Sequence, residues 1–237
     1  MSSERSPNGS LLMESQIIAR IARLWQATTV HDVPDPIPTV TLAGRHVRLE
    51  PLSTDHAEGL AAAAAADRST YDLSPVPEGV GAFTAYIAGL LDDHAHGRVL
   101  PFAQRRTDSG ELVGCTRYLD PHWWRGRAEP DEIEIGGTWL GVEAQRTPIN
   151  TEAKYLLLTH AFETLGVWRV AVCTDARNQR SRDAIERIGA TFEGVLRNHR
   201  VVSDADVPSP RQTAVFSVIV DEWPEVKRGL ESRLTNR

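Results

Sequence analysis

Residues Asp131-Glu-Ile-Glu-Ile-Gly-Gly-Thr-Trp-Leu140 open the stretch that decides the fold. Ile133 and Ile135 alternate with carboxylates, which is the spacing of a strand with two different faces. A polar loop from Gly141 to Asn150 follows. Apolar residues then recur every three or four positions up to Leu165, as on one face of a helix. The stretch therefore begins with a strand, a loop and a helix.

The expected helix carries its own start and stop signals. Thr147 suits the N-cap position, and Pro148 suits the first helical position, where a missing N–H costs least. Gly166 suits a left-handed C-cap. A strand from Trp168 to Thr174 and a second helix from Asn178 to Ile188 follow. The whole stretch is thus strand, loop, helix, strand and helix, which is an α/β pattern.

The loop before the first helix leads into a helix N-terminus. Such an end offers free backbone N–H groups and the positive end of the helix dipole, which together favour a phosphate or pyrophosphate. An ordinary crossover helix has the same sequence pattern. The pattern by itself leaves an anion site and a plain connector both open.

Composition narrows the class of protein. The chain has 237 residues and a net charge of −6, which disfavours a broad nucleic-acid-binding surface. Cys115 and Cys173 lie in strand-like runs, so we expect buried free thiols in a reducing compartment. We find no metal-ligand spacing of Cys and His, no apolar run that could span a membrane and no signal-peptide layout. A cytoplasmic protein without metal, membrane or nucleic-acid partner is expected.

The N-terminal region looks separate from the rest. Leu12 to Ala27 is a helix candidate with one apolar face, and His31 to Pro38 is a proline-rich connector. We therefore expect an N-terminal extension over residues 1–39 and a main domain over residues 40–237. The apolar face must dock on its own domain or on a second copy of the chain, and a homodimer is an expectation on that ground.

The remaining elements are expected as a strand from Val40 to Leu52 with a turn at Gly44, helices from Thr54 to Ala66 and Gly81 to His96, strands at Val99–Arg106, Leu112–Asp120, Thr191–Val202 and Gln212–Val220, and a last helix from Pro224. Together with the central stretch, they predict an α/β chain with a mixed sheet.

The central stretch resembles the core of the GNAT N-acyltransferases, and most closely their ribosomal-protein N-terminal acetyltransferase-like (RimJ/RimL-type) branch. The matching residues are Thr151-Glu-Ala153, His160-Ala-Phe-Glu163, Leu165-Gly166, Arg169-Val170, Asp175-Ala-Arg-Asn178, Ser181, Ile188-Gly-Ala190 and Glu193-Gly-Val-Leu-Arg197. The resemblance covers roughly Leu42 to Leu230. It implies a GNAT-like mixed, mostly antiparallel twisted sheet flanked by helices, with the extra N-terminal helix outside the family core.

The resemblance also implies a function. The chain would be an acyl-CoA-dependent N-acyltransferase, and in the simplest case an N-acetyltransferase, that moves the acyl group directly from the CoA thioester to an amine. Acetyl-CoA or another acyl-CoA would be the co-substrate. The acceptor would be an amine of a protein or of a small molecule. No Ser/His/Asp or Cys/His constellation argues for a covalent enzyme intermediate.

The family holds its donor along the end of the central strand and on the loop that follows. Carried over residue by residue, this predicts donor contacts from Trp139, Leu140, Gln145, Arg146, Thr147, Ile149, Asn150, Asn178 and Ser181. Ser181 is also the candidate acid that protonates the leaving thiolate, because Ile185 stands where many family members have a Tyr. A Ser that bonds back to the preceding turn is the structural alternative.

The base and the acceptor contacts are assigned from the position and chemistry of the residues near the expected acyl site. Glu134 is the candidate base, with Glu132 on the same strand face as its alternative, since alternate residues of a strand point to one side. For Glu132 and Glu134 alike, the structural alternative is a solvent-exposed strand face or an ion pair with an arginine. Tyr71, Trp123 and Trp124 are the candidate acceptor contacts, and ordinary loop packing is their alternative.

The chain departs from the family at the donor loop. The family pattern is Gln/Arg-x-x-Gly-x-Gly/Ala, whereas this loop has Pro148 and Asn150 at the two small-residue positions. Pro148 lacks an N–H for a phosphate, and Arg146 is the residue that could compensate. A GNAT-fold binding module that has lost catalysis is therefore the alternative function. A structural dimer part, joined through the N-terminal helix, is a third.

Overall fold

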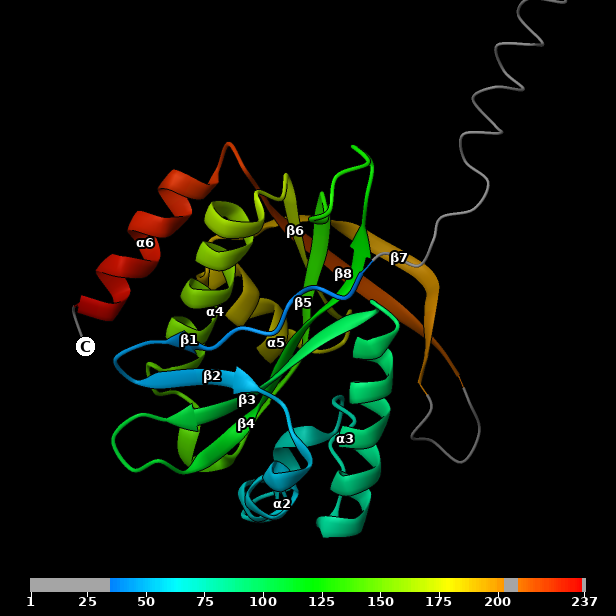
Figure 1. The fold of residues 1–237 in the computed structure, drawn as a ribbon, viewed down its shortest axis with the longest axis vertical. Coiled ribbons are helices and arrows are strands. Elements are labelled where there is room, and N and C mark those ends of the chain that lie inside the picture. The colour runs from blue at the N-terminus through cyan, green and yellow to red at the C-terminus, as the bar shows by residue number, and fades with distance from the viewer. Residues whose placement is uncertain (1–34, 203–208, 236–237) are drawn as a thin grey trace, which may run out of the picture. The chain divides into compact units, whose positions relative to one another are not determined.

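The computed structural model describes residues 35–202 and 209–235 (Figure 1). The expected helix from Leu12 to Ala27 lies outside the described residues, so that helix and the boundary at residue 39 stay predictions. The strands are β1 (Leu42–Ala43), β2 (Val47–Pro51), β3 (Val99–Arg106), β4 (Leu112–His122), β5 (Glu132–Leu140), β6 (Arg169–Asp175), β7 (Thr191–Val202) and β8 (Ser209–Ile219). The α-helices are α2 (Ala57–Ala65), α3 (Gly79–Ala95), α4 (Ile149–Thr159), α5 (Gln179–Arg187) and α6 (Trp223–Thr235).

The eight strands form one sheet in the order β1-β2-β3-β4-β5-β6-β8-β7. Every neighbouring pair is antiparallel except β5 and β6, which run parallel. The expected order of strands and helices and the expected mixed, mostly antiparallel sheet are confirmed. The crossover between the two parallel strands is α4, as the pattern of the central stretch predicted.

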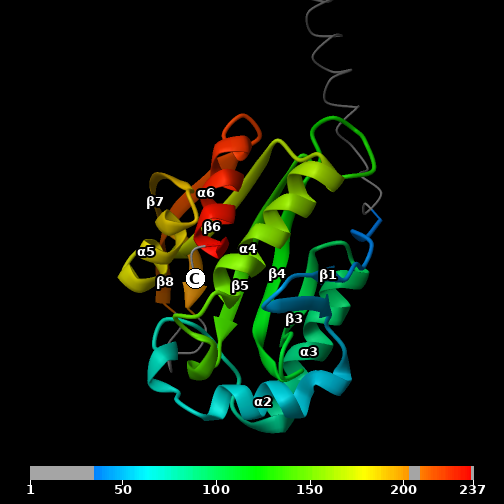
Figure 2. The same cartoon turned by 90° about the vertical axis from the view of Figure 1, so that its left-hand side faces the viewer.

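Helices cover the two faces of the sheet unequally (Figures 1 and 2). On one face α4 and α6 pack over a core that includes Ile133, Ile135 and Phe216. On the other face α2 and α3 pack over β3 and β4, around Phe83 and Trp139. α2 and α3 reach β5 only at its end near Trp139, so no helix of the described residues covers the rest of this face, from β5 to β8, and it can line a groove.

Several boundaries differ from the sequence prediction. Ser53, and not Thr54, precedes the first helix, which starts with a 3-10 turn η1 (Thr54–His56). A further 3-10 turn, η2 (Ser69–Tyr71), lies in the loop before α3, and η3 (Val142–Ala144) lies after β5. The helix after the donor loop ends in a π-helical turn, η4 (His160–Leu165), because its last bonds skip one further residue.

The first predicted strand is broken into β1 and β2 by a turn that a carboxylate holds in place. Glu152 of α4 is buried and accepts the backbone N–H groups of Arg45, His46 and Val47 at 2.8, 2.6 and 2.8 Å. A Cβ on Gly44 would come within 2.5 Å of the Glu152 carboxyl carbon, so only glycine fits there. Three donors satisfy this buried charge and tie α4 to the edge of the sheet.

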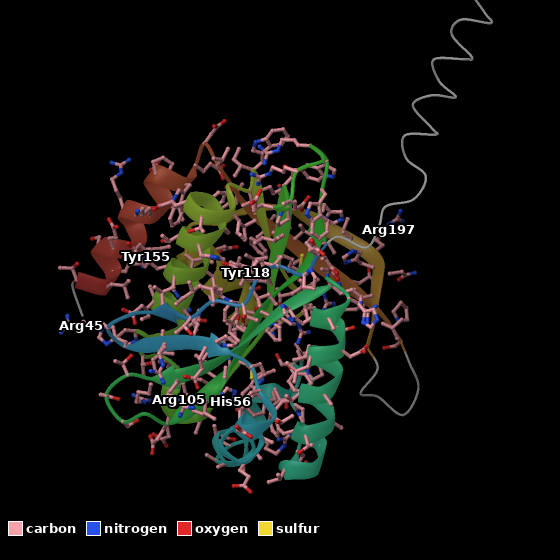
Figure 3. All side chains as sticks on the ribbon, in the orientation of Figure 1. Arg45, His56, Arg105, Tyr118, Tyr155 and Arg197 are labelled. Carbon is pink, nitrogen blue, oxygen red and sulfur yellow. The ribbon has the colours of Figure 1, made fainter. Side chains whose placement is uncertain are left out.

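Polar side chains also cross the main core. Tyr118 points from β4 into the interior, and its hydroxyl donates to the Leu157 carbonyl at 2.6 Å (Figure 3). Lys154 of α4 is buried as well, and its Nζ donates to Thr138 Oγ1 at 2.6 Å. Burial lowers the pKa of Lys154 from the ordinary 10.5 to about 7. This shift comes from desolvation of the amine.

The two cysteines differ from each other. Both are free thiols, as predicted, but Cys115 is buried whereas Cys173 is half-buried on β6. The expectation of burial is wrong for Cys173, because no helix of the described residues covers the face of β6 that carries it. Within residues 35–202 and 209–235, no helix is long and apolar enough to cross a membrane.

Lys154→Met should remove a pH dependence of folding stability. The unfolded chain binds a proton at Lys154 up to about pH 10.5, whereas the folded chain releases it near pH 7. Wild-type stability therefore rises with pH between these values, by about 1 kcal/mol per pH unit, and the variant should lack this rise. Urea unfolding from pH 6 to pH 10 measures it. Lys227→Met, at a partly exposed lysine paired with Glu163, is the matched control. Parallel curves for wild type and Lys154→Met would contradict the prediction.

Candidate active site

The site begins where β5 and β6 part. Their parallel pairing covers three positions and ends at Glu134 opposite Ala171. Gly137 then adopts a left-handed φ of +56° inside a bulge, where the register of β5 against β4 shifts. β5 bends with β4 while β6 stays on β8, so the two strands splay. The splay exposes backbone N–H and C=O groups between the strands.

Two helix N-termini flank this splay. β5 and β6 are parallel, so both of their carboxyl ends lie at one edge of the sheet, and α4 and α5 start from that edge (Figure 2). Asn178 is the N-cap of α5, and its Oδ1 accepts the Ser181 N–H at 3.0 Å, as predicted. Both helix ends direct partial positive charge toward the edge where a donor phosphate would bind.

The loop between β5 and α4 is tightly folded. Arg146 has a left-handed φ of +60°, and the Thr147 hydroxyl donates to the Ala144 carbonyl at 2.6 Å. Pro148, and not Thr147, is the N-cap residue, so the helix begins one position later than predicted, at Ile149, whose side chain lies in the core. Only the backbone of Ile149 is therefore available to a ligand, whereas the Arg146 side chain is exposed.

The end of β5 is held by the η2 turn. The Leu140 carbonyl accepts bonds from the Tyr71 hydroxyl at 3.1 Å and from Gln145 Nε2 at 2.9 Å. Gln145 also donates to the Thr70 hydroxyl at 3.1 Å. The Trp139 ring is buried against Tyr71 and Phe83, so its side chain belongs to the core under α2 and α3. Trp139 and Leu140 thus offer a donor their backbone and not their side chains.

Next to the splay, a cavity of about 470 Å³ opens on the part of the sheet face that no helix of the described residues covers. We call it the acidic groove. It is lined by Asp120 and His122 of β4, Glu132 and Glu134 of β5, Arg169, Ala171 and Cys173 of β6, Glu193, Gly194, Leu196, His199 and Arg200 of β7, and Val215 of β8. Four of these side chains are carboxylates and two are guanidiniums.

Glu134 lies on the floor of the acidic groove, at the last paired position of β5. Its side chain is 7% exposed and is paired with Arg200 Nη2 at 2.7 Å. Burial raises the pKa of Glu134, the charge of Arg200 opposes this, and Asp120 adds to the increase. A carboxyl group with a raised pKa at the edge of the splay has the properties of a general base.

Glu132 has a different setting. It accepts from Arg169 Nε at 3.0 Å, and Arg169 also makes two bonds of 2.5 and 2.7 Å with Glu193. Glu132 and Glu134 face the same side, as predicted, and each has an arginine partner. Glu132 is two positions farther from the splay than Glu134.

The candidate acceptor residues do not gather in the acidic groove. Tyr71 is buried beneath the strand end, and the Trp123 indole N–H donates to the carbonyl of Ala128 in its own loop. Trp124 is 56% exposed and stacks on His122, which does line the groove. Trp124 is therefore the member of this set whose ring stacks on a groove residue.

Sequence analysis missed Asp120, Cys173, His199 and Arg200, which line the acidic groove. Asp120 sits in a β4 bulge and His199 in a β7 bulge, where strand alternation no longer predicts which face a residue takes. The alternation of residues along β6 could have placed Cys173 on the groove face, because Val170 and Val172 take the opposite face. Arg197, by contrast, matches the family pattern but points out from β7 (Figure 3).

Comparison with known proteins agrees with this geometry. The family model described as "Acetyltransferase (GNAT) domain" matches residues 46–191. A GCN5-related N-acetyltransferase from Brucella melitensis is 31% identical, with a TM-score of 0.72 over 85% of this chain and 87% of that one. The Mycobacterium smegmatis RimJ structure in complex with CoA-disulfide is 22% identical, with a TM-score of 0.66 over 84% of this chain and 93% of that one, and so shares the fold.

A curated relative matches over a shorter part. The Bacillus subtilis (strain 168) protein named "Putative ribosomal N-acetyltransferase YdaF" is 34% identical over 87 residues, which are 37% of this chain and 45% of that protein. The chain thus matches less than half the length of this curated relative. The resemblance to the RimJ/RimL-like branch, stated from the sequence, is confirmed. The family model covers more than half of the chain and the solved GCN5-related N-acetyltransferase shares its fold, so the chain belongs to the GNAT acetyltransferase family.

Proposed function

We propose that this chain is an acyl-CoA-dependent N-acetyltransferase that transfers an acetyl group directly to a primary amine of a protein or small molecule. The observation that carries the proposal is the position of Glu134. It lies where the β5–β6 pairing ends, so one side chain reaches the acidic groove at the point where the splay begins. A cytoplasmic location and a homodimer remain predictions.

The residues present fit a CoA donor. The splayed backbone of β5 suits an amide-containing arm, and the N-termini of α4 and α5 suit phosphates. Gln145, Arg146, Thr147, Ile149 and Asn150 would hold the donor from the loop, and Asn178 and Ser181 from α5. When bound, acyl-CoA supplies an acyl group activated as a thioester.

The protein's own groups then move protons. Glu134 accepts one proton from the acceptor ammonium, and the neutral amine then forms the new C–N bond. Ser181 donates its hydroxyl proton to the sulfur when the C–S bond breaks, and the second proton that the amine nitrogen loses restores the Ser181 hydroxyl. The transfer needs no covalent bond to the protein, and the Cys173 thiol is a poor nucleophile here, because burial and Glu134 raise its pKa to about 12.

The donor loop is tested by binding. Acetyl-CoA titrated into the protein by calorimetry should bind with micromolar affinity, and saturation at 100 times Kd should add about 2.7 kcal/mol of stability. Arg146→Gln should weaken binding roughly tenfold or more, because a charge-assisted bond to phosphate is lost. Arg98→Gln, at an exposed arginine of the turn after α3, is the control. If neither acetyl-CoA nor succinyl-CoA binds at millimolar concentration, the chain is a binding module that has kept the fold without its donor.

Glu134→Gln tests the base. It should lower kcat by about 10²-fold or more, because proton transfer at the nitrogen loses its acceptor. A base works in its deprotonated form, so wild-type kcat/KM should rise with pH through a value above the ordinary 4.5 of a glutamic acid. This rise of kcat/KM with pH should be absent in Glu134→Gln. An unchanged pH profile with unchanged kcat would leave Glu134 as an ion-pair partner.

Ser181→Ala tests the acid. It should lower kcat about 10²-fold while the Kd for acetyl-CoA and the thermal midpoint stay near the wild-type values, since the cap bond uses the Ser181 backbone N–H and not its hydroxyl. Ser181→Thr keeps a hydroxyl and should recover most of the rate. Equal rates for wild type and Ser181→Ala would remove Ser181 from the mechanism.

A further inference from the structure

The acidic groove already holds a cation, and that cation belongs to the protein. Arg200 Nη2 lies 2.6 Å from Asp120 Oδ2 and 2.7 Å from Glu134 Oε2. One nitrogen between two carboxylates is the arrangement that also binds an ammonium group. The side chain of Glu134 is 7% exposed and that of Asp120 is 58% exposed. The cation therefore sits above a buried carboxylate and beneath an exposed one.

Arg200 is held weakly from its other side. In the register of β7 and β8 it lies opposite Arg211, and like charges at paired positions repel each other. Arg211 Nη2 is buried without a hydrogen-bond partner among the described residues. β7 is an edge strand, and its register shifts between Leu196 and Arg200. Arg200 can therefore leave the groove without breaking regular sheet structure.

Asp120 is placed by an unusual backbone. Its φ of +48° is left-handed, which an L-residue adopts at a cost, and it lies in the β4 bulge between Leu119 and His122. The bulge directs the carboxylate over the floor of the groove toward Arg200. An exposed ion pair stabilises the fold only weakly, so the Asp120–Arg200 pair by itself would not offset the cost of this backbone conformation. Such strained residues cluster at functional sites.

The charge balance favours a cationic occupant. Four carboxylates and two guanidiniums line the acidic groove. Glu132 and Glu193 share Arg169, so their charges are partly balanced independently of Arg200. If Arg200 moves out, Asp120 and Glu134 face the groove as an unpaired carboxylate pair. A bound ammonium would restore the balance.

We propose that Asp120 binds the acceptor together with Glu134, that the pair holds the acceptor as an ammonium ion, and that Arg200 fills the same place until the acceptor displaces it. The proposal rests on the proposed function and adds a substrate class: amines that are protonated near neutral pH. Displacement also brings the ammonium against the group that takes its proton. One N–H bond breaks and one O–H bond forms on Glu134, and the neutral amine is released to attack the thioester.

The test compares variants in steady-state kinetics with acetyl-CoA and three acceptors. The acceptors are a peptide with a free N-terminus and no lysine, an N-terminally blocked peptide with one lysine, and 1,4-diaminobutane. Asp120→Asn keeps the shape, and Asn tolerates a left-handed backbone. It should raise KM for the preferred amine about tenfold or more, with kcat and the Kd for acetyl-CoA little changed. Asp92→Asn, at an exposed aspartate paired with Arg98, should match wild type.

Arg200→Gln gives the opposite expectation. Without the competing cation, KM for the same amine should fall. This variant tests the proposal independently if Asp120→Asn does not fold. An unchanged KM in both variants, with normal donor binding and kcat, would overturn the proposal while the enzyme activity stands. If no acceptor turns over, calorimetry of the three amines replaces kinetics. Loss of amine binding in Asp120→Asn would still support the site, and no binding to wild type would overturn it.

Discussion

The three-residue parallel pairing of β5 with β6 is the constraint on which the rest of the site depends. It fixes the order of the sheet, because a parallel neighbour requires the α4 crossover. It also ends early, since Gly137 turns β5 away at a φ of +56°. A Cβ at Gly136 would approach Leu119 Cδ2 to 2.7 Å. The bulge therefore depends on Gly136 for space and on Gly137 for its left-handed backbone. A longer pairing would close the splay, and both the donor backbone and the entrance to the acidic groove would be lost.

The same pairing explains why the groove is charged. Glu132 and Glu134 point away from the α4 core because Ile133 and Ile135 point into it. No helix of the described residues covers this part of β5, so the two carboxylates line a groove that opens to water although their strand is central in the sheet. Arginines from β6 and β7 offset the cost of partial burial. Because the apolar residues of β5 fill the core on one face of the sheet, its alternating carboxylates form a polar surface on the other face.

Much of the fold could be predicted from the sequence, because β5, α4, β6 and α5 have clear periodicity and clear ends. The signals at Gly166 and Asn178 gave correct caps. The site was predicted less completely. Glu134 follows from alternation along a regular strand, but Asp120 and Arg200 sit at bulges that alternation cannot describe, and they come from strands distant in sequence. Tyr71 and Trp139 were expected at the ligand, yet their rings pack against each other in the core, because tertiary burial outweighs position along the chain.

The structure also changes the expected effect of Pro148 on phosphate binding. From the sequence it removes a phosphate donor at the start of a helix. In the structure Pro148 is the N-cap, and its carbonyl accepts the Glu152 N–H at 2.9 Å. The N–H groups that helix geometry leaves without intrahelical acceptors then belong to residues after it, including Asn150 and Thr151. Proline at this place presets φ without removing those donors, and the left-handed turn at Arg146 leads the chain into it. The departure from the family pattern therefore changes how the loop is shaped more than how many donors the helix end can offer.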